Sequence, residues 1–235
     1  MKIGIIGAME EEITVLANHL EGVEHFSDGG ADFISGRYGM HEVVLVRSGI
    51  GKVLAAVTTT LLIDRYHVDY LINTGSAGGI GKGLKIGDVV IANRLAYHDV
   101  DVTAFGYEPG QMAGMPLYYE ADKTLVQRAE TASERVGLDA KVGLIVSGDQ
   151  FVHSQDQIQR IHHLFPEVLA NEMEGTAIAQ VAFQFRVPFV VIRAMSDVGD
   201  ESANVNFDEF IIEAGKKSAE MVMALLDELD EEAVL

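Results

Sequence analysis

The sequence predicts an α/β fold, a three-layer sandwich in which helices flank a central mixed, mainly parallel twisted sheet. Short apolar runs such as Ile3–Ala8 alternate along the chain with helical patterns such as Glu10–Leu20. The runs are continuous, which is typical of strands buried on both faces. The 24 glycines supply tight turns between these segments. Strands that alternate with helices in this way form mainly parallel sheets.

The first half of the chain shows apolar runs separated by turn residues. In chain order we expect a strand at Ile3–Ala8, a helix at Glu10–Leu20, strands at Phe33–Tyr38 and Glu42–Arg47, a helix at Lys52–Tyr66, and strands at Tyr70–Asn73 and Asp88–Ala96. The segment from Tyr97 to Leu117 is long, aromatic and rich in glycine and proline. We expect it to be an irregular loop that forms a lid or a subunit contact.

The second half continues the alternation and ends in a long helix with an acidic tail. We expect a helix at Thr124–Val136, a strand at Val142–Val146, a helix at Gln155–Leu164, a strand at Val168–Ala170, a helix at Gly175–Phe185, a strand at Phe189–Ile192 and a helix at Phe207–Leu229. Neither a linker nor a low-complexity run interrupts this order, so we expect residues 1–235 to form a single domain.

The charge and composition of the chain exclude several kinds of partner. The net charge is −19, from 36 acidic and 17 basic residues, and it repels nucleic acid and anionic membranes. The chain has no cysteine, which excludes disulfides and thiol catalysis and suits a reducing cytoplasm. The histidines, including His98 and the pair His162–His163, lack metal-ligand spacing and are expected on loops or helix surfaces. We expect a cytoplasmic protein without a metal, a cofactor, a nucleic-acid partner or a membrane partner.

Acidic residues follow three of the expected strands, at the edge where open α/β sheets bind ligands. Glu172 and Glu174 follow one strand, Asp197 follows another, and Glu12 comes after the first. Half-buried carboxylates in such places can have pKa values tuned for proton transfer. Glu172 and Glu174 could instead only compensate the dipole of the next helix. Glu12 projects to the opposite side of its helix from Glu10 and could activate a water molecule.

Three further segments at strand ends are candidates for ligand contacts. The segment Gly4–Gly7 has G-x-x-G spacing, which does not match the dinucleotide-binding pattern, and the acids after it would repel a pyrophosphate. The segment Asn73–Gly79 is either a tight turn or a cradle of backbone N–H groups with Ser76 as a hydroxyl donor. In the segment Ser147–Val152, Phe151 is either a core residue or stacks on a planar ligand.

Together these segments closely resemble the 5′-methylthioadenosine/S-adenosylhomocysteine nucleosidases, a family within the purine nucleoside phosphorylase superfamily. The resemblance runs essentially from end to end, and its spacing separates this family from its relatives. It rests on the segments Gly4–Glu12, Ser48–Val53, Asn73–Gly79, Tyr97–Tyr107, Ser147–Phe151, Glu172–Glu174 and Ser196–Asp197. It implies a nucleoside phosphorylase-like fold.

The resemblance implies hydrolysis of the N-glycosidic bond between adenine and a 5′-thio-substituted ribose. The substrates would be 5′-methylthioadenosine, S-adenosylhomocysteine and also 5′-deoxyadenosine, in methionine salvage and methyl-cycle recycling. By this match Asp197 protonates N7 of adenine, while Glu12 activates the water with help from Ser76 and Arg193. Glu174 holds the ribose hydroxyls and tightens its hold as positive charge grows on the sugar.

The same match implies the residues that bind the substrate. Phe151 is expected to stack on adenine, and the backbone of Val152 to read its edge. Val102 and Phe105 are expected from the second subunit of a homodimer. The remaining substrate-binding residues are the apolar 5′ pocket of Met9, Ile50, Met173 and Phe207, and the contacts Ala77, Gly78, Glu172 and Ser196.

The chain departs from the usual family pattern at four positions. Asn171 and Gly175 flank the Glu-Met-Glu segment, where the family usually has Val and Ala. Pro109 and Ala113 replace the Tyr and Pro of several relatives. These departures bear on the 5′-substituent rather than on the reaction. The alternatives are a phosphate-dependent purine nucleoside phosphorylase, a futalosine-type nucleosidase and a nucleoside-binding sensor, and the acidic residues at the site disfavour phosphate.

Overall fold

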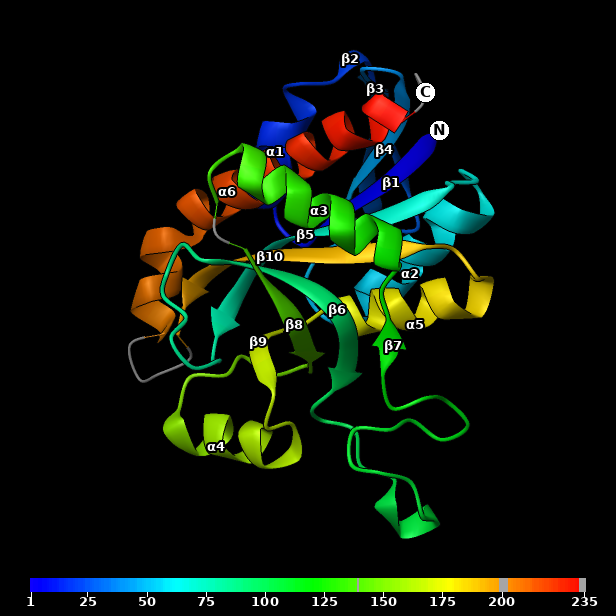
Figure 1. Cartoon of the computed structure of the whole chain (residues 1–235). Coiled ribbons are helices and arrows are strands. Elements are labelled where there is room, and N and C mark those ends of the chain that lie inside the picture. The colour runs from blue at the N-terminus through cyan, green and yellow to red at the C-terminus, as the bar shows by residue number, and fades with distance from the viewer. Residues whose placement is uncertain (139, 199–202, 233–235) are drawn as a thin grey trace.

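The computed structural model describes residues 1–138, 140–198 and 203–232, and in these ranges it contains ten strands, six α-helices and one 3-10 helix, η1 (Figure 1). The first half contains β1 (Lys2–Gly7), α1 (Glu10–Ala17), β2 (Glu21–Asp28), β3 (Ala31–Tyr38), β4 (His41–Arg47), α2 (Lys52–Asp64), β5 (Tyr70–Gly79), β6 (Val89–Tyr97) and η1 (Thr103–Phe105). The second half contains β7 (Tyr119–Glu120), α3 (Lys123–Arg135), β8 (Ala140–Ser147), α4 (Gln155–Leu164), β9 (Val168–Glu172), α5 (Gly175–Phe185), β10 (Phe189–Asp197) and α6 (Ala203–Glu232).

The strands form one mixed sheet, as the sequence predicts. Their order is β10-β6-β8-β9-β5-β1-β4-β3-β2, with β7 beside β6. β10 also pairs with β5, so β5, β10, β6, β8 and β9 close into a ring. The carboxyl ends of three strands meet at Gly78, which pairs with Asn171 of β9 and with Asp197 of β10. The ring therefore brings the two acidic strand ends together.

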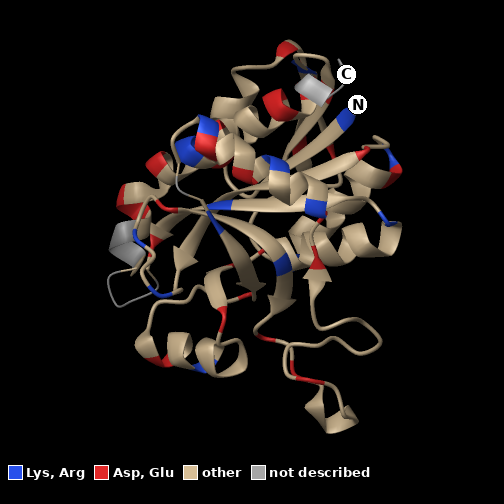
Figure 2. Cartoon of the chain, in the orientation of Figure 1, with Lys and Arg blue, Asp and Glu red and all other residues tan. Residues whose placement is uncertain are grey.

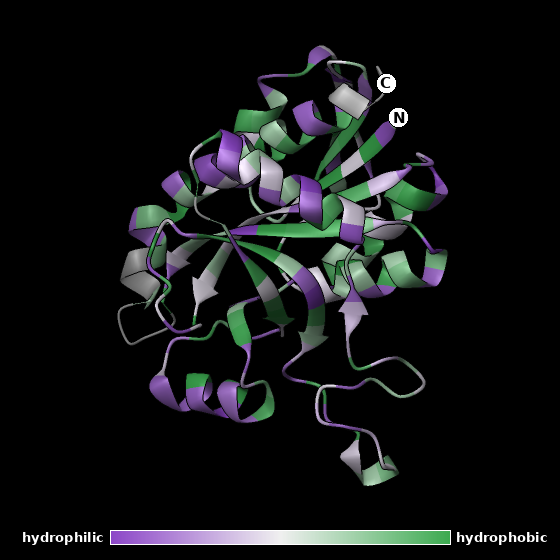
Figure 3. Cartoon of the chain, in the orientation of Figure 1, coloured by the Kyte–Doolittle hydropathy of each residue, from purple (hydrophilic) through white to green (hydrophobic). Residues whose placement is uncertain are grey.

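Helices cover both faces of the sheet. α6 packs on β5 and β10 and contacts α1 and α3, so these three helices form one layer (Figure 1). α2 and α5 pack against each other on the opposite face. The strands supply buried apolar side chains such as Ile5, Leu45 and Val191, and Figure 3 shows largely hydrophobic strands between helices of mixed character. The predicted three-layer α/β architecture is confirmed.

The structure differs from the sequence prediction at the edge of the sheet and at two strand ends. β2 has no predicted counterpart, because this edge strand is polar, mostly exposed and lacks an alternating apolar pattern. β5 and β10 continue beyond their predicted ends at Asn73 and Ile192, because each provides pairing partners for the other. Ser76 and Asp197, expected beyond the ends of these strands, therefore lie within them, and Asp197 is the last residue of β10.

Charged residues occur along most of the fold, and a few of them, such as Arg193, are buried. Figure 2 shows acidic residues on many helices and loops, with basic residues dispersed among them in this view. None of the helices in the described ranges is long and apolar enough to cross a membrane.

Candidate active site

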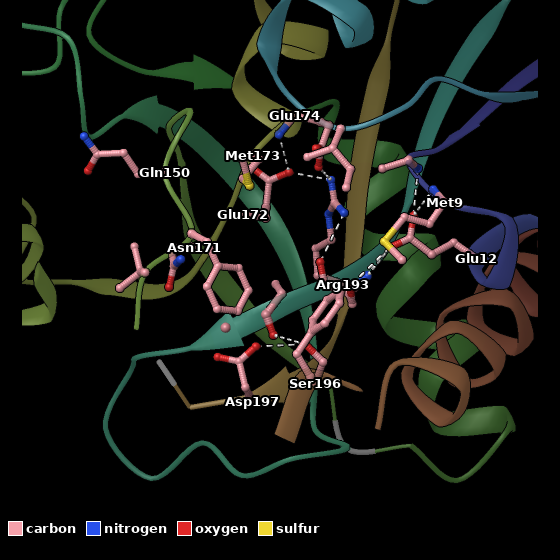
Figure 4. Close-up of a pocket in the computed structure, with 18 residues that line it drawn as sticks. Met9, Glu12, Gln150, Asn171, Glu172, Met173, Glu174, Arg193, Ser196 and Asp197 are labelled. Atoms are coloured by element: carbon pink, nitrogen blue, oxygen red, sulfur yellow. Dashed lines mark hydrogen bonds and ion pairs between the residues drawn. The ribbon is translucent and has the colours of Figure 1, made fainter. Parts of the chain in front are cut away.

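A cavity of about 260 Å³ lies where β5, β9 and β10 end (Figure 4). It brings together every site residue that the sequence predicts for a single subunit. These are Met9, Glu12, Ile50, Ser76, Ala77, Gly78, Phe151, Val152, Glu172, Met173, Glu174, Arg193, Ser196, Asp197 and Phe207. Ala8, Gln150 and Asn171 also line the cavity and were not predicted as site residues. Each of them adjoins a predicted site residue in the sequence, and Asn171 is also a departure from the usual family pattern.

Val102 and Phe105 do not line this cavity. Phe105 lies in η1 and is 82% exposed, and Val102 directly precedes this short helix. Figure 1 shows the surrounding segment extending away from the sheet. Pro109 and Ala113 in the same segment are exposed. The assignment of Val102 and Phe105 to the pocket of a second subunit stays a prediction.

Glu12 is buried, and both of its carboxylate oxygens accept hydrogen bonds. Oε2 accepts from the backbone N–H groups of Ala8 at 2.7 Å and Met9 at 3.1 Å. Oε1 accepts from the backbone N–H and the hydroxyl of Ser76, both at 3.1 Å. Gly75 permits this approach, since a Cβ there would lie 2.8 Å from Cδ of Glu12. The carboxylate is thus fixed between the end of β1 and the middle of β5.

Arg193 is the one basic residue among the described residues that line the cavity, and it is buried among acids. Its Nη2 donates to Oδ1 of Asn73 at 2.7 Å and forms ion pairs with Glu172 and, at 3.5 Å, with Glu174. Nη1 donates to the carbonyl of Ser76 at 3.2 Å. Burial alone would lower the pKa of Arg193, but the surrounding carboxylates more than offset it and raise the pKa.

Glu172 is held by protein groups on both oxygens. Oε2 accepts from the N–H groups of Glu174 at 3.0 Å and Gly175 at 2.7 Å, and also from Arg193. Oε1 accepts from the hydroxyl of Ser147. The carboxylate therefore compensates the first turn of α5, which was one of the two interpretations of the sequence. It also neutralises Arg193 while lining the cavity.

Glu174 has fewer protein partners than Glu172. Its Oε1 accepts from the N–H of Gly51 at 2.8 Å, and its Oε2 lies 3.5 Å from Arg193. Burial, and after it the charge of Glu172, raises the pKa of Glu174 to about 7. A carboxylate accepts up to about four hydrogen bonds, so Glu174 keeps capacity for hydrogen bonds from a ligand.

Ser196 and Asp197 end β10 side by side at the cavity. The hydroxyl of Ser196 donates to Oδ2 of Asp197 at 2.9 Å. The pairing register with β5 shifts between Met195 and Asp197, and such bulges redirect side chains next to active sites. Oδ1 of Asp197 lies 3.0 Å from the point that a Cβ of Gly78 would occupy. The missing side chain at Gly78 therefore leaves space beside this acid.

The loop after β8 supplies an aromatic surface. Phe151 is 38% exposed, and its ring meets Phe207 edge-on, with 5.8 Å between ring centroids and 81° between planes. Val152 beside it is buried. A partly exposed ring in a cavity suits stacking on a planar ligand better than the alternative role in the core.

An ion-pair cluster fixes this loop to the start of α2. Nζ of Lys52 lies 2.7 Å from Asp99 and 3.6 Å from Asp149, and the backbone N–H of Lys52 donates to Asp149 at 2.9 Å. His98 is buried, and burial lowers its pKa. His98 lies in the loop that follows β6, as the sequence predicts, and its N–H donates to the carbonyl of Ser147 at 3.0 Å.

The last helix joins the two main strands of the site. The hydroxyl of Ser218 in α6 accepts from the N–H of Gly75 at 3.0 Å and donates to the carbonyl of Ile192 at 3.3 Å. It also lies 2.6 Å from the hydroxyl of Thr74. This one side chain therefore ties β5 to β10 just before the residues that line the cavity.

The cavity has more acids than bases. Of the described residues that line it, four are acidic and one is basic. Such a site stabilises positive charge that develops in a ligand and disfavours an anion. Among the residues that the structure describes, no three His, Asp or Glu side chains group to hold a metal ion. The aromatic surface, the apolar lining and the carboxyl groups suit a planar base joined to a hydroxyl-bearing sugar.

Known proteins match this chain over nearly its whole length. The phosphorylase superfamily matches residues 2–227. The S-adenosylhomocysteine nucleosidase from Streptococcus pyogenes is 50% identical over 97% of each chain, with a TM-score of 0.95. The 5′-methylthioadenosine/S-adenosylhomocysteine nucleosidase from Streptococcus pneumoniae is 53% identical, with a TM-score of 0.94, over 97% of this chain and 100% of that one. Futalosine hydrolase from Helicobacter pylori is 37% identical, with a TM-score of 0.93, over 97% of this chain and 98% of that one. The chain belongs to the phosphorylase superfamily and, within it, to the 5′-methylthioadenosine/S-adenosylhomocysteine nucleosidases.

Proposed function

We propose that this protein hydrolyses the N-glycosidic bond of 5′-methylthioadenosine and S-adenosylhomocysteine, releasing adenine and the substituted ribose. The observation that carries the proposal is that the carboxyl groups of Glu12, Glu174 and Asp197 line one cavity together with the ring of Phe151. These groups can supply a base for water, an acceptor for sugar hydroxyls, an acid for the leaving base and a stacking surface. The two nucleosidases from Streptococcus support the same assignment.

Asp197 is the proposed acid for the leaving group. Adenine leaves poorly as an anion, so a proton moves from the Asp197 carboxyl to N7 while the bond between C1′ and N9 breaks. The bonding electron pair goes to adenine, which leaves as a neutral base. The Ser196 hydroxyl, 2.9 Å from Oδ2, stabilises the carboxylate that remains. A positioned acid of this kind contributes on the order of 10²–10⁴-fold in rate.

Glu12 is the proposed base for the attacking water. Its two oxygens already accept four hydrogen bonds, so a water needs one of these sites. The hydroxyl of Ser76 is the partner that can rotate away, whereas the three backbone N–H groups are fixed. The water oxygen then bonds to C1′, and its proton passes to Oε1 of Glu12. Arg193 holds the carbonyl of Ser76 at 3.2 Å and keeps this strand in place.

Glu174 is the proposed partner of the ribose. As the glycosidic bond breaks, positive charge grows on C1′ and the sugar ring oxygen. Hydrogen bonds from the ribose hydroxyls to a carboxylate strengthen as this charge develops. The excess of acidic residues around the cavity also stabilises this positive charge.

Phosphorolysis is the first alternative, and the charge of the cavity argues against it. A phosphate at C1′ would face Glu12 and Glu174, while the one lining cation, Arg193, is engaged by acids. The test is adenine release from 5′-methylthioadenosine in phosphate-free buffer. We expect full turnover without phosphate. A strict requirement for phosphate would overturn the proposal.

The 5′ end of the substrate is proposed to lie against Met9, Ile50, Met173 and Phe207. These lining side chains are apolar, which suits a thiomethyl group and also the shorter 5′-deoxyadenosine. The likeness to futalosine hydrolase makes a futalosine-type nucleoside the second candidate. Values of kcat/KM measured side by side for these nucleosides decide between the candidates. We expect kcat/KM to be higher for 5′-methylthioadenosine than for a futalosine-type substrate. The reverse order would assign the enzyme to the futalosine-type nucleosidases.

A homodimer is part of the proposal. Exposed apolar residues lie on α2 at Val53, Leu54 and Val57, and on the adjoining α5 at Phe183 and Phe185. Exposed apolar side chains that gather on two adjoining helices are typical of protein interfaces. We propose that a two-fold interface on these helices carries the η1 segment of each subunit to the other.

The segment with Val102 and Phe105 would then complete the partner's 5′ pocket. Phe105→Ala tests this, because a residue that is 82% exposed contributes little to the fold of its own chain. We expect a dimer by light scattering, an unchanged melting temperature and a lower kcat/KM for this variant. A monomeric enzyme with full activity would contradict the proposal.

The wider context follows from the proposed reaction. We propose that residues 1–235 act as one nucleosidase domain in the cytoplasm, in methionine salvage, where the thio-substituted ribose is recovered. The single mixed sheet uses strands from Lys2 to Asp197, which supports one domain. Accumulation of 5′-methylthioadenosine after loss of the protein would support this role, and unchanged levels would contradict it.

A further inference from the structure

Asn171 is a pocket residue that the proposed reaction does not use. It lies in β9, where it pairs with Gly78 of β5 and Val146 of β8. Its side chain lines the cavity, the residue is 6% exposed, and Oδ1 has no hydrogen-bond partner among the residues that the structure describes. A buried polar atom without a partner costs stability, so its presence needs an explanation. A ligand group that donates a hydrogen bond to Oδ1 would explain it.

The position of Asn171 indicates which part of a ligand it meets. Its Oδ1 and Oδ1 of Asp197 each lie 3.0 Å from the point that a Cβ of Gly78 would occupy. The distance between these two oxygens is therefore at most twice 3.0 Å. Between them lies a space that stays open because Gly78 has no side chain. Figure 4 shows both side chains bordering the same part of the pocket. Asn171 thus lies beside the acid that we place at N7 of the purine.

The chemistry of adenine then identifies the partner. On the edge of the base, N7 is adjacent to the 6-amino group, which is a hydrogen-bond donor. We propose that the carboxamide oxygen of Asn171 accepts a hydrogen bond from this 6-amino group and makes Asn171 a specificity-determining residue. Rotation of the carboxamide exchanges Oδ1 and Nδ2 with little change of shape. Oδ1 then turns to the base, and Nδ2 turns toward the Asp197 carboxylate left after proton transfer.

This inference rests on the proposed function, and its test compares two bases that differ only in the amino group. Adenine and purine, which lacks the 6-amino group, are titrated calorimetrically into the wild-type enzyme and into N171L, whose side chain has similar size without polar atoms. A neutral hydrogen bond is worth a factor of about 3 to 10 in affinity. We expect the Kd of adenine to rise by this factor in N171L, and the Kd of purine to change by less than about twofold.

Two further variants make the test specific. N171S keeps a polar group that is too short to reach the base, so it should show the same selective loss even if the larger leucine perturbs the fold. Q150L removes the other uncharged amide that lines the cavity, and it should affect adenine and purine equally. Equal losses for both bases in N171L and N171S, or a selective loss in Q150L, would overturn the assignment of Asn171.

The outcomes also separate this inference from the proposed function. If the wild-type enzyme releases adenine from 5′-methylthioadenosine but N171L and N171S lose affinity for both bases alike, only the role of Asn171 fails. If the wild-type enzyme neither binds adenine nor cleaves the nucleoside, the proposed function fails and the inference with it.

Discussion

Glu172 and Glu174 are two residues apart and both are buried, yet their carboxylates have different numbers of hydrogen-bond partners. Glu172 accepts from two backbone N–H groups, the Ser147 hydroxyl and Arg193. Glu174 accepts one backbone hydrogen bond and lies at 3.5 Å from Arg193, with its pKa raised. We assign Glu172, whose acceptor sites are occupied and which is paired with Arg193, to the framework of the site. Its neighbour, with unused capacity, is the one available to a ligand.

The comparison predicts the largest change in stability at Glu172. In Glu172→Gln the side chain keeps its size, but Arg193 loses its strongest ion pair and an NH₂ group faces backbone donors. Removing one partner of a buried pair costs about 3–5 kcal/mol. Urea unfolding at pH 7 measures this as a fall in the free energy of unfolding. A loss no larger than that of Glu174→Gln would remove the distinction between the two acids.

The largest loss of catalysis among these acids is predicted at Glu174. Glu174→Gln cannot strengthen its hold on the ribose as positive charge develops, so kcat/KM should fall by about 10²–10³-fold. The melting temperature should stay equal or rise, because one charge of a crowded acidic pair is gone. Steady-state kinetics and calorimetry on the same preparation check both. Near-normal kcat/KM in this variant would show that Glu174 also belongs to the framework.

Because the pKa of Glu174 is raised, the difference in stability between the wild type and Glu174→Gln should depend on pH. Between the ordinary glutamate pKa of 4.5 and about 7, the folded protein keeps a proton that the unfolded chain releases. The contribution of Glu174 to stability is therefore fully present below pH 4.5 and is lost as pH rises to 7. Relative to Glu174→Gln, the wild type should lose on the order of 1–3 kcal/mol over this window. Parallel stability curves for the two proteins would contradict the raised pKa.

Ser76→Ala should have the smallest effect. The Ser76 hydroxyl is one of four donors to Glu12, and a water can take its place once it is removed. We expect less than about a tenfold fall in kcat, in line with a single neutral hydrogen bond. Glu12→Gln in the same assay should lose far more. A loss in Ser76→Ala as large as in Glu12→Gln would mean that Ser76 itself holds the reacting water.

The sequence predicts the composition of the site better than its internal connections. Apolar periodicity locates most elements, and α4 and α5 begin and end at their predicted residues. The full lining expected for one subunit is found in one cavity because the family resemblance supplies it. Local patterns carry no information on pairing partners. The closure of the ring at β5 and β10 and the contact that holds His98 each depend on a neighbour distant in sequence. The edge strand β2 pairs with the adjacent strand β3, but its polar, mostly exposed sequence gives no alternating apolar pattern.

The different roles of the two glutamates could not be predicted from the sequence for the same reason. Glu172 and Glu174 lie in one short acidic segment, and the residue types around them do not distinguish them. The difference arises in the fold, where the N–H groups of Glu174 and Gly175 at the start of α5 face Glu172. Contacts with Ser147, Gly51 and Arg193, which lie on other elements, add to it. Asn171 was visible as a departure from the family pattern, but its unpaired oxygen is a property of the folded pocket.

The contact of Ser218 with β5 and β10 has a consequence for synthesis of the chain. Residues up to Asp197 contain every acid of the cavity, yet the hydroxyl that joins Gly75 to Ile192 arrives only with the last helix. A nascent chain that emerges from the ribosome at about 5–20 residues per second exposes these acids for seconds before α6 can dock. Activity should therefore appear only after release of the full chain. Messages cut short before α6 should yield protein that is inactive and prone to aggregate.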